Sequence, residues 1–127
     1  MMWPIFWPGD TDFSNPANDR HPSADLSAEG KNIADQIAAV VKASGVSGDP
    51  HGYGQTVAGM LFPDVLPYVV GTPATHGFAG INGRPLADNA PEVMFSLVLG
   101  KATTAGLTPS VAEHLRDASF PYVVPAP

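Results

Sequence analysis

This chain contains no cysteine, and that absence removes several kinds of chemistry at once. Disulfide bonds, thiolate metal sites and cysteine nucleophiles are all excluded. Basic residues are also few, since six Lys and Arg stand against twelve Asp and Glu and the formal net charge is −6. Phosphate groups are neutralised by clustered Lys and Arg, so we expect neither nucleic-acid binding nor docking on an anionic membrane surface.

Long apolar runs are missing as well. The sequence has no stretch of about 20 apolar residues, the length that a membrane helix requires. Residues 65–83 carry no charge, but Pro67, Gly71, Pro73 and Gly77 interrupt them. The first residues lack the basic segment of a signal peptide. These absences exclude a membrane span and leave the cellular compartment open.

Proline and glycine are abundant, with 14 and 13 residues, and 44% of the chain is hydrophobic. This composition predicts a packed but loop-rich structure rather than a disordered one. We divide the chain into an aromatic N-terminal arm and polar loop at residues 1–22 and a single globular domain at residues 23–127, which ends in a Pro-rich tail. The expected fold is α+β and mainly helical, with three or four helices, long Pro/Gly-rich loops and a few short strands.

Helical periodicity is clearest in residues 23–45, where Ser23 or Asp25 can cap the start and Gly45 suits the end. A second helix is expected over residues 55–61, and a short one follows Thr108. The residues expected to face the core are Leu26, Ile33, Ile37, Val40, Val41 and Ser44 in the first helix, Tyr53, Val57, Met60 and Leu61 in the second, and Val111 and Leu115 in the short one.

A turn, a helix start and an apolar segment follow one another in residues 81–99. Asn82-Gly83 is a strong turn dipeptide, and Asp88 or Asn89 can cap a helix that has Pro91 in its first turn. The run from 93 to 99 is apolar nearly all round, which predicts burial on most sides. We favour a helix, and its β-branched content leaves a central strand as the alternative.

The motif Asn-Gly-Arg-Pro-Leu-Ala-Asp at 82–88, with the apolar run behind it and the terminal segment 120–125, resembles the C-terminal part of the bacterial domain-of-unknown-function 4331 family. Residues 61–66 resemble the segment that precedes this motif, and residues 15–19 match an earlier piece. The resemblance covers most of this chain but only part of a typical member. Asn89 stands where members usually have a second acidic residue, so no paired-carboxylate site is implied. The resemblance implies a fold more than an activity.

Arg84 and Asp88 lie four residues apart in this motif and are expected to pair. Their simplest role is to pin the loop to the helix start. The alternative is that the Arg84 guanidinium binds a ligand carboxylate. If the protein is an enzyme, His76, Arg84 and Asp88 are the candidate catalytic residues, in a small-molecule site at a subunit boundary.

No two of the four histidines have the spacing that builds a metal site on one element. The polar loop offers Asp10, Asp12 and His21 as metal candidates, but it lacks the glycine and closing Glu of a calcium loop. Turns stabilised by Asp and Asn side chains explain its composition equally well. We therefore expect no metal and no cofactor.

The two ends of the chain are rich in aromatic residues. Trp3, Phe6 and Trp7 stand in the arm, and Tyr122 and Val123 stand in the tail. Such residues are enriched in protein interfaces, so we expect them to contact another protein chain or a second copy of this one. For the arm, the simpler alternative is that it packs back on the core of this domain. The leading interpretation is a non-catalytic structural or interaction subunit of a larger bacterial assembly, and the alternative is an enzyme or enzyme subunit.

Overall fold

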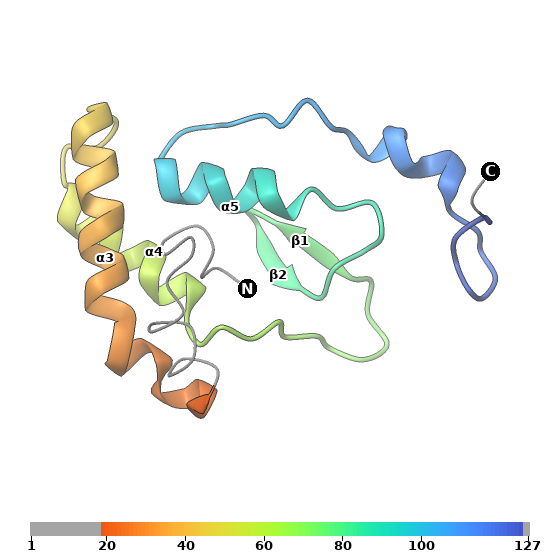
Figure 1. The fold of residues 1–127 in the computed structure, drawn as a ribbon, viewed down its shortest axis with the longest axis horizontal. Helices are drawn as coiled ribbons and strands as arrows, with labels where there is room; N and C mark the ends of the chain where they lie inside the picture. The colour runs from red at the N-terminus through yellow and green to blue at the C-terminus, as the bar shows by residue number, and fades with distance from the viewer. Residues whose placement is uncertain (1–18, 126–127) are drawn as a thin grey trace. The chain divides into compact units, whose positions relative to one another are not determined.

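The computed structural model describes residues 19–125 (Figure 1), so the predicted aromatic arm and most of the polar loop lie outside the described residues. The described chain confirms a mainly helical α+β fold. Its elements in chain order are η1 (Pro22–Ala24), α3 (Asp25–Ser44), α4 (Pro50–Leu61), β1 (Thr75–Gly77), β2 (Gly80–Asn82), α5 (Ala90–Leu99) and η2 (Pro109–Leu115).

These elements form two compact units. The first comprises the described residues up to Val65 together with Ser96–Ala102, and the second comprises Leu66–Phe95 and the residues from Thr103 onward. The boundary falls within α5, so its first half belongs to the second unit and its last turn to the first.

In the first unit α3 packs along α4, as Figure 1 shows. The helix α3 presents Ile33, Ile37 and Val41 at intervals of four residues, and all three are at most 1% exposed. Val57 of α4 meets this stripe and is also fully buried. Burial of one such side chain stabilises the folded state by about 1.5–3 kcal/mol. These four residues form the centre of the apolar core of the unit.

Gly54 sets how closely the two helices approach. A Cβ atom at this position would overlap the carbonyl oxygen of Ala34 and would lie 3.2 Å from the backbone nitrogen of Ala38. Only glycine fits against the neighbouring backbone at such a distance. By contrast, a Cβ atom at Gly30 would meet only the flexible side chain of Leu26.

The first helix differs from the sequence prediction at its start. Neither Ser23 nor Asp25 caps α3: the cap residue is Ala24, which makes no side-chain hydrogen bond. Asp25 is instead the first helical residue, 4% exposed, and its Oδ2 accepts from the backbone N–H of Asp64 at 3.3 Å. At the other end Gly45 adopts φ 67°, which confirms the predicted left-handed terminus.

The second helix begins at Pro50, five residues before the predicted start, because Asp49 caps it through a hydrogen bond from Gly52 N to Oδ1 at 3.0 Å. Several predicted inward positions are wrong because the buried face of each helix is narrower than its apolar face. The exposed ones are Leu26, Val40, Ser44, Met60, Val111 and Leu115.

In the second unit β1 and β2 form an antiparallel hairpin in which Thr75 pairs with Asn82 and His76 with Ile81. The hairpin turn is formed by residues 78–79 and not by Asn82-Gly83. Gly83 has φ 73° and follows the second strand, where a Cβ atom would lie 2.9 Å from the ring of Tyr68. Asn82-Gly83 therefore lies where β2 ends, and Gly83 packs against Tyr68 of the loop that precedes the hairpin.

The apolar run at 93–99 is helical, as favoured over the strand. Asp88 and Asn89 both serve its start: Asp88 Oδ1 accepts from Ala90 N at 3.0 Å, and Asn89 Oδ1 accepts from Glu92 N at 3.4 Å. The run is buried on most sides, as predicted: Val93, Ser96 and Val98 are buried, and Phe95, at 44%, is its one exposed side chain.

The final described segment is held by its own backbone. The element η2 is a 3-10 helix, and the chain then turns back so that Arg116 pairs with Val123 and Val124 N donates to Leu115 O at 3.0 Å. Tyr122 N donates to Ser119 O at 2.6 Å and closes the turn. This segment, residues 109–124, is named the C-terminal turn segment below.

Candidate functional site

Arg84 and Asp88 form a two-pronged ion pair in the second unit, as their spacing predicted. Arg84 Nε donates to Asp88 Oδ2 and Arg84 Nη2 donates to Oδ1, both at 2.8 Å. The Asp88 side chain is 2% exposed, whereas that of Arg84 is 52% exposed. The guanidinium thus seals a buried carboxylate while its outer side meets solvent.

The protonation of this pair follows from its contacts. The hydrogen bonds from Arg84 hold the pKa of Asp88 below its ordinary value of 3.8, and the N–H of Ala90 and the charges of Arg84 and His76 act in the same direction. The hydrogen bonds to Asp88 likewise raise the pKa of Arg84. Asp88 is therefore a weak base whose two oxygens are already occupied.

The charge of His76 makes the smallest contribution to the lowered pKa of Asp88, and all three candidate catalytic residues belong to the second unit. His76 Nδ1 is buried and makes no hydrogen bond within the described chain. The geometry favours the role of pinning the loop: Arg84 holds Asp88, and Asp88 holds the first N–H of α5.

Two residues beside this pair, Asn89 and Glu92, make contacts with the loop after α5 that sequence reasoning did not predict. Glu92 Oε2 accepts from Ala105 N at 2.9 Å and from Asn89 Nδ2 at 3.0 Å. Asn89 Nδ2 also donates to Leu107 O at 3.0 Å. These contacts tie the loop after α5 to its start. The spacing of three between Asn89 and Glu92 is the sequence signal that could have indicated them.

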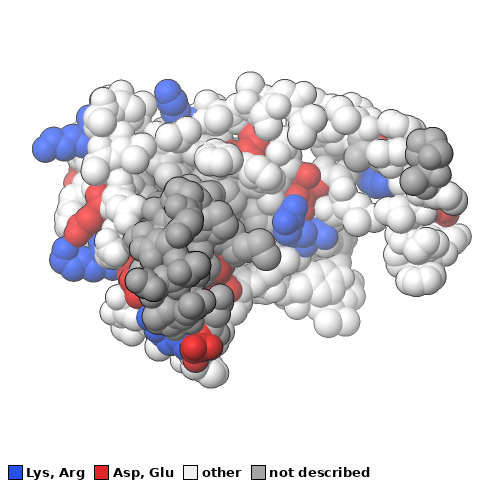
Figure 2. All heavy atoms as spheres, viewed as in Figure 1, with Lys and Arg blue, Asp and Glu red and all other residues white. Residues whose placement is uncertain are grey.

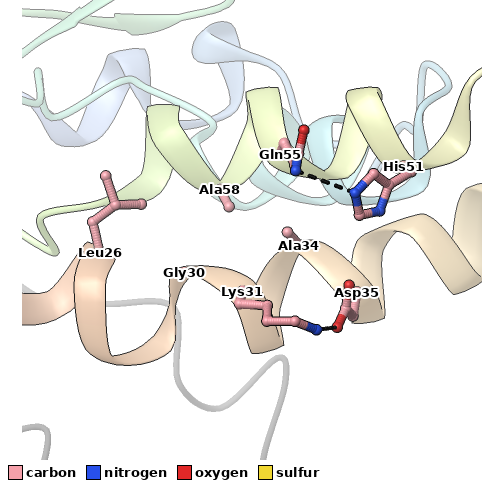
Figure 3. A pocket seen from close by; sticks show the side chains of 8 residues that line it. All are labelled: Leu26, Gly30, Lys31, Ala34, Asp35, His51, Gln55 and Ala58. Carbon is pink, nitrogen blue, oxygen red and sulfur yellow. Dashed lines mark hydrogen bonds and ion pairs between the residues drawn. The ribbon is translucent and has the colours of Figure 1, made fainter.

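A groove of about 340 Å³ lies between α3 and α4 in the first unit (Figure 3). Its base is formed by small residues, Gly30, Ala34 and Ala58. Its polar edge has Lys31 and Asp35 on α3, and His51 and Gln55 on α4. In Figure 3 the polar pairs line opposite sides of the groove.

Both polar pairs are satisfied within their own helices. Lys31 Nζ lies 2.5 Å from Asp35 Oδ2, and Gln55 Nε2 lies 3.2 Å from His51 Nε2. Lys31 holds the pKa of Asp35 below its ordinary value, with a smaller contribution from His51. Each pair has a spacing of four residues, but only helix packing places the two pairs on one groove.

The C-terminal turn segment shows large apolar side chains to solvent. Phe120 is 83% exposed and Tyr122 is 51% exposed, and their rings meet edge to face at 6.0 Å. Val111, Leu115 and Val123 of the same segment are each about half exposed. Tyr122 and Val123, the two partner-binding candidates of the tail, thus lie on an accessible apolar surface.

The remaining candidates separate into two groups. Asp10, Asp12, Trp3, Phe6 and Trp7 lie outside the described residues. His21 is described, and its Nδ1 lies 2.9 Å from Ser23 Oγ and accepts from Ser23 N at 3.3 Å. Within residues 19–125 no three His, Asp or Glu side chains are grouped so as to hold a metal ion.

Comparison with known proteins gave no match among family models, curated proteins or solved structures. The family resemblance stays a prediction from the sequence. None of the helices between residues 19 and 125 has the length and apolarity needed to cross a membrane. On the face drawn in Figure 2, the described basic atoms form small separate groups, and several of these lie next to acidic atoms.

Proposed function

We propose that this protein is a non-catalytic interaction subunit of a larger assembly and that its C-terminal turn segment contacts another protein chain. The observation that carries the proposal is the imbalance of apolar residues in the second unit. Its buried apolar side chains are Ala90 and Val93, whereas the large apolar residues that it leaves exposed are Leu66, Tyr68, Val69, Val70, Phe78, Leu86, Phe95, Leu107, Val111, Leu115, Phe120, Tyr122 and Val123. Exposed apolar side chains that lie against one another, as Phe120 and Tyr122 do, are typical of a protein-binding surface.

The C-terminal turn segment is the best-formed part of that surface. Its backbone is closed by the Arg116–Val123 pairing and by the bond from Tyr122 N to Ser119 O, so the backbone that carries these side chains is formed before binding. A preformed surface loses less conformational entropy on binding than a flexible one. Phe120 and Tyr122 at its tip are the residue types that dominate binding energy in interfaces.

The charge of the chain supports a protein partner over a nucleic acid. The formal net charge is −6, and no two of the six basic residues are close to each other in the sequence. In the second unit, Arg84 is already bound to Asp88. An apolar groove on another polypeptide is the surface that would complement the protruding Phe120 and Tyr122 side chains.

Native mass spectrometry of the chain isolated from the cells that express it tests this proposal. We expect a mass above that of one chain, and we expect the combined Phe120→Ser and Tyr122→Ser variant to fall to the single-chain mass. Met60→Ser on α4 is the matched control, because Met60 is 52% exposed and lies outside the segment. The mass of the complex distinguishes a second copy from a different partner. A single bare chain at all concentrations would refute the proposal.

An enzyme that uses His76, Arg84 and Asp88 is the second candidate, favoured by the buried and unbonded Nδ1 of His76 beside the ion pair. It is weaker because both oxygens of Asp88 are occupied and its pKa is lowered. His76→Ala should then retain the assembly mass and lose turnover. An interaction subunit should show an unchanged mass in this variant and no activity to lose.

A further inference from the structure

Asn82-Gly83 is the single Asn-Gly pair in the 127 residues. In such a pair the backbone nitrogen of the glycine can attack the side-chain carbonyl carbon of the asparagine. Glycine favours the attack because it has no side chain and reaches conformations that other residues do not. In the structure, hydrogen bonds hold both the Gly83 nitrogen and the Asn82 side-chain amide, and they oppose this reaction.

The reaction has two balanced steps. Gly83 N gives up its proton and bonds to Asn82 Cγ, the Cγ–Nδ2 bond breaks, and ammonia leaves with a five-membered imide behind it. Water then opens the ring at either carbonyl, which leaves aspartate or isoaspartate at position 82. No cofactor and no oxidant take part.

In the folded loop every reacting atom is engaged elsewhere. Gly83 N donates to Pro67 O at 2.6 Å, so its hydrogen is turned away from Asn82. Asn82 Nδ2 donates to Thr72 Oγ1 at 2.9 Å and to Pro73 O at 3.0 Å, and Oδ1 accepts from Val69 N at 2.8 Å. Cyclisation requires the hydrogen bonds of Gly83 N and of Asn82 Nδ2 to break.

The loop that makes these contacts is held mainly by polar interactions. Val69 and Val70 are 63% and 88% exposed, so they contribute little apolar burial. Tyr68 Oη donates to Thr72 O at 2.8 Å, and Thr72 Oγ1 donates to Val69 O at 2.7 Å. Segments with few buried apolar contacts open locally at a lower free energy than the core.

We propose that Asn82 is a spontaneous modification site, converted to aspartate or isoaspartate through Gly83 and gated by opening of the loop at residues 67–73. After the conversion, the loop cannot form its original hydrogen bonds to residue 82 again. Aspartate has no N–H to give to Thr72 or Pro73, and it would place a carboxylate oxygen against the Pro73 carbonyl. Isoaspartate adds a backbone atom next to the Thr75–Asn82 pairing. The site needs no partner protein.

Loop variants test the gate. The full chain, folded and in guanidinium chloride, is incubated at mildly alkaline pH, and aspartate and isoaspartate at position 82 are quantified by fragmentation mass spectrometry. Tyr68→Phe removes one hydrogen bond of the loop and should raise the rate in the folded chain about fivefold, the factor that corresponds to one typical bond. Thr72→Val removes two bonds and should raise it further.

Thr104→Val is the matched control, because Thr104 makes a comparable turn contact with Gly106 N away from the loop, and its rate should equal that of the unchanged chain. Circular dichroism confirms that each variant is folded. We expect the fastest conversion in the denatured chain. Equal rates in the folded and denatured chains, or folded Tyr68→Phe and Thr72→Val chains with the unchanged rate, would overturn the proposal.

Discussion

Asp88 uses both carboxylate oxygens to hold its neighbours. Arg84 occupies Oδ1 and Oδ2, and Ala90 N takes a second bond to Oδ1. Asn82 does the same with its amide, which binds Val69, Thr72 and Pro73. In this loop-rich unit, polar side chains fix backbone segments that no large apolar core holds.

Replacement of Arg84 by alanine should therefore lower stability. Arg84→Ala leaves the Asp88 carboxylate, whose side chain is 2% exposed, with the Ala90 N–H alone. We expect a loss of about 1–2 kcal/mol, at the low end for a charged hydrogen bond because the guanidinium is half exposed to solvent. Denaturant unfolding measures it. Lys31→Ala, which breaks an exposed pair of the same spacing, should change the midpoint little; an equal effect of both would contradict the structural role.

The same pair predicts a dependence of stability on pH. The pKa of Asp88 in the folded chain is below the unfolded value of about 3.8. At pH values near and below 3.8 the folded chain therefore binds fewer protons at Asp88 than the unfolded chain does. The contribution is fully present above pH 3.8 and is lost as pH falls through the lower folded pKa. Asp88→Asn should lack this component. Thermal unfolding from neutral to acid pH checks it, and parallel curves for the two proteins would show that Asp88 does not titrate as described.

At the scale of elements, the α3–α4 pair depends on shape as much as on apolarity. Ile33, Ile37 and Val41 form the seam, but Gly54 decides the separation of the helices because its missing side chain lets the Ala34 backbone approach. Helix propensity alone disfavours glycine inside a helix by about 1 kcal/mol. Close packing therefore outweighs local propensity at this position.

Gly54→Ala should destabilise the protein, since its Cβ atom would overlap the Ala34 carbonyl oxygen and force the helices apart. We expect a cost of about 1–3 kcal/mol, the usual range for overpacking. Gly59→Ala is the control on the same helix: nothing lies within 4 Å of its Cβ position, so it should stabilise by up to about 1 kcal/mol. Urea unfolding of both variants decides the point, and two changes of the same sign would mean that Gly54 has no packing role.

At the scale of the whole molecule, residues 19–125 expose more large apolar side chains than they bury. Val70 and Phe120 are more than 80% exposed within the described residues, and the formal charge of −6 is carried by few ionic groups. Exposed apolar side chains of this size are the observation at this scale that supports the proposed interaction role.

Removal of residues 1–8 should reduce assembly. These eight positions hold two Trp, one Phe, one Ile and two Met, a density that predicts an interface. The truncated chain should show a lower native mass than the full chain in size-exclusion chromatography with light scattering. Replacement of Pro125–Pro127 by serines is a control of the other terminus. An unchanged mass after truncation would show that the arm does not mediate assembly.

Sequence alone determined the features that depend on local chemistry. Gly45 ends a helix because only a residue without Cβ enters the left-handed region easily, and Asp88 and Asn89 start one because their oxygens satisfy free N–H groups. The Arg84–Asp88 pairing followed from their spacing. The mainly helical α+β class likewise followed from periodicity, caps and Pro/Gly content.

Tertiary structure decided what depends on contacts between distant residues. Val40 and Met60 are as apolar as Ile37 and Val57 but are exposed, and periodicity does not reveal which apolar position meets a neighbour. The packing of α3 against α4 forms the groove and places along it two local pairs, Lys31–Asp35 and His51–Gln55. The Asn82-Gly83 pair predicted a turn, but its hydrogen bonds to Val69, Thr72 and Pro73, up to 13 residues away, could not be read from the sequence.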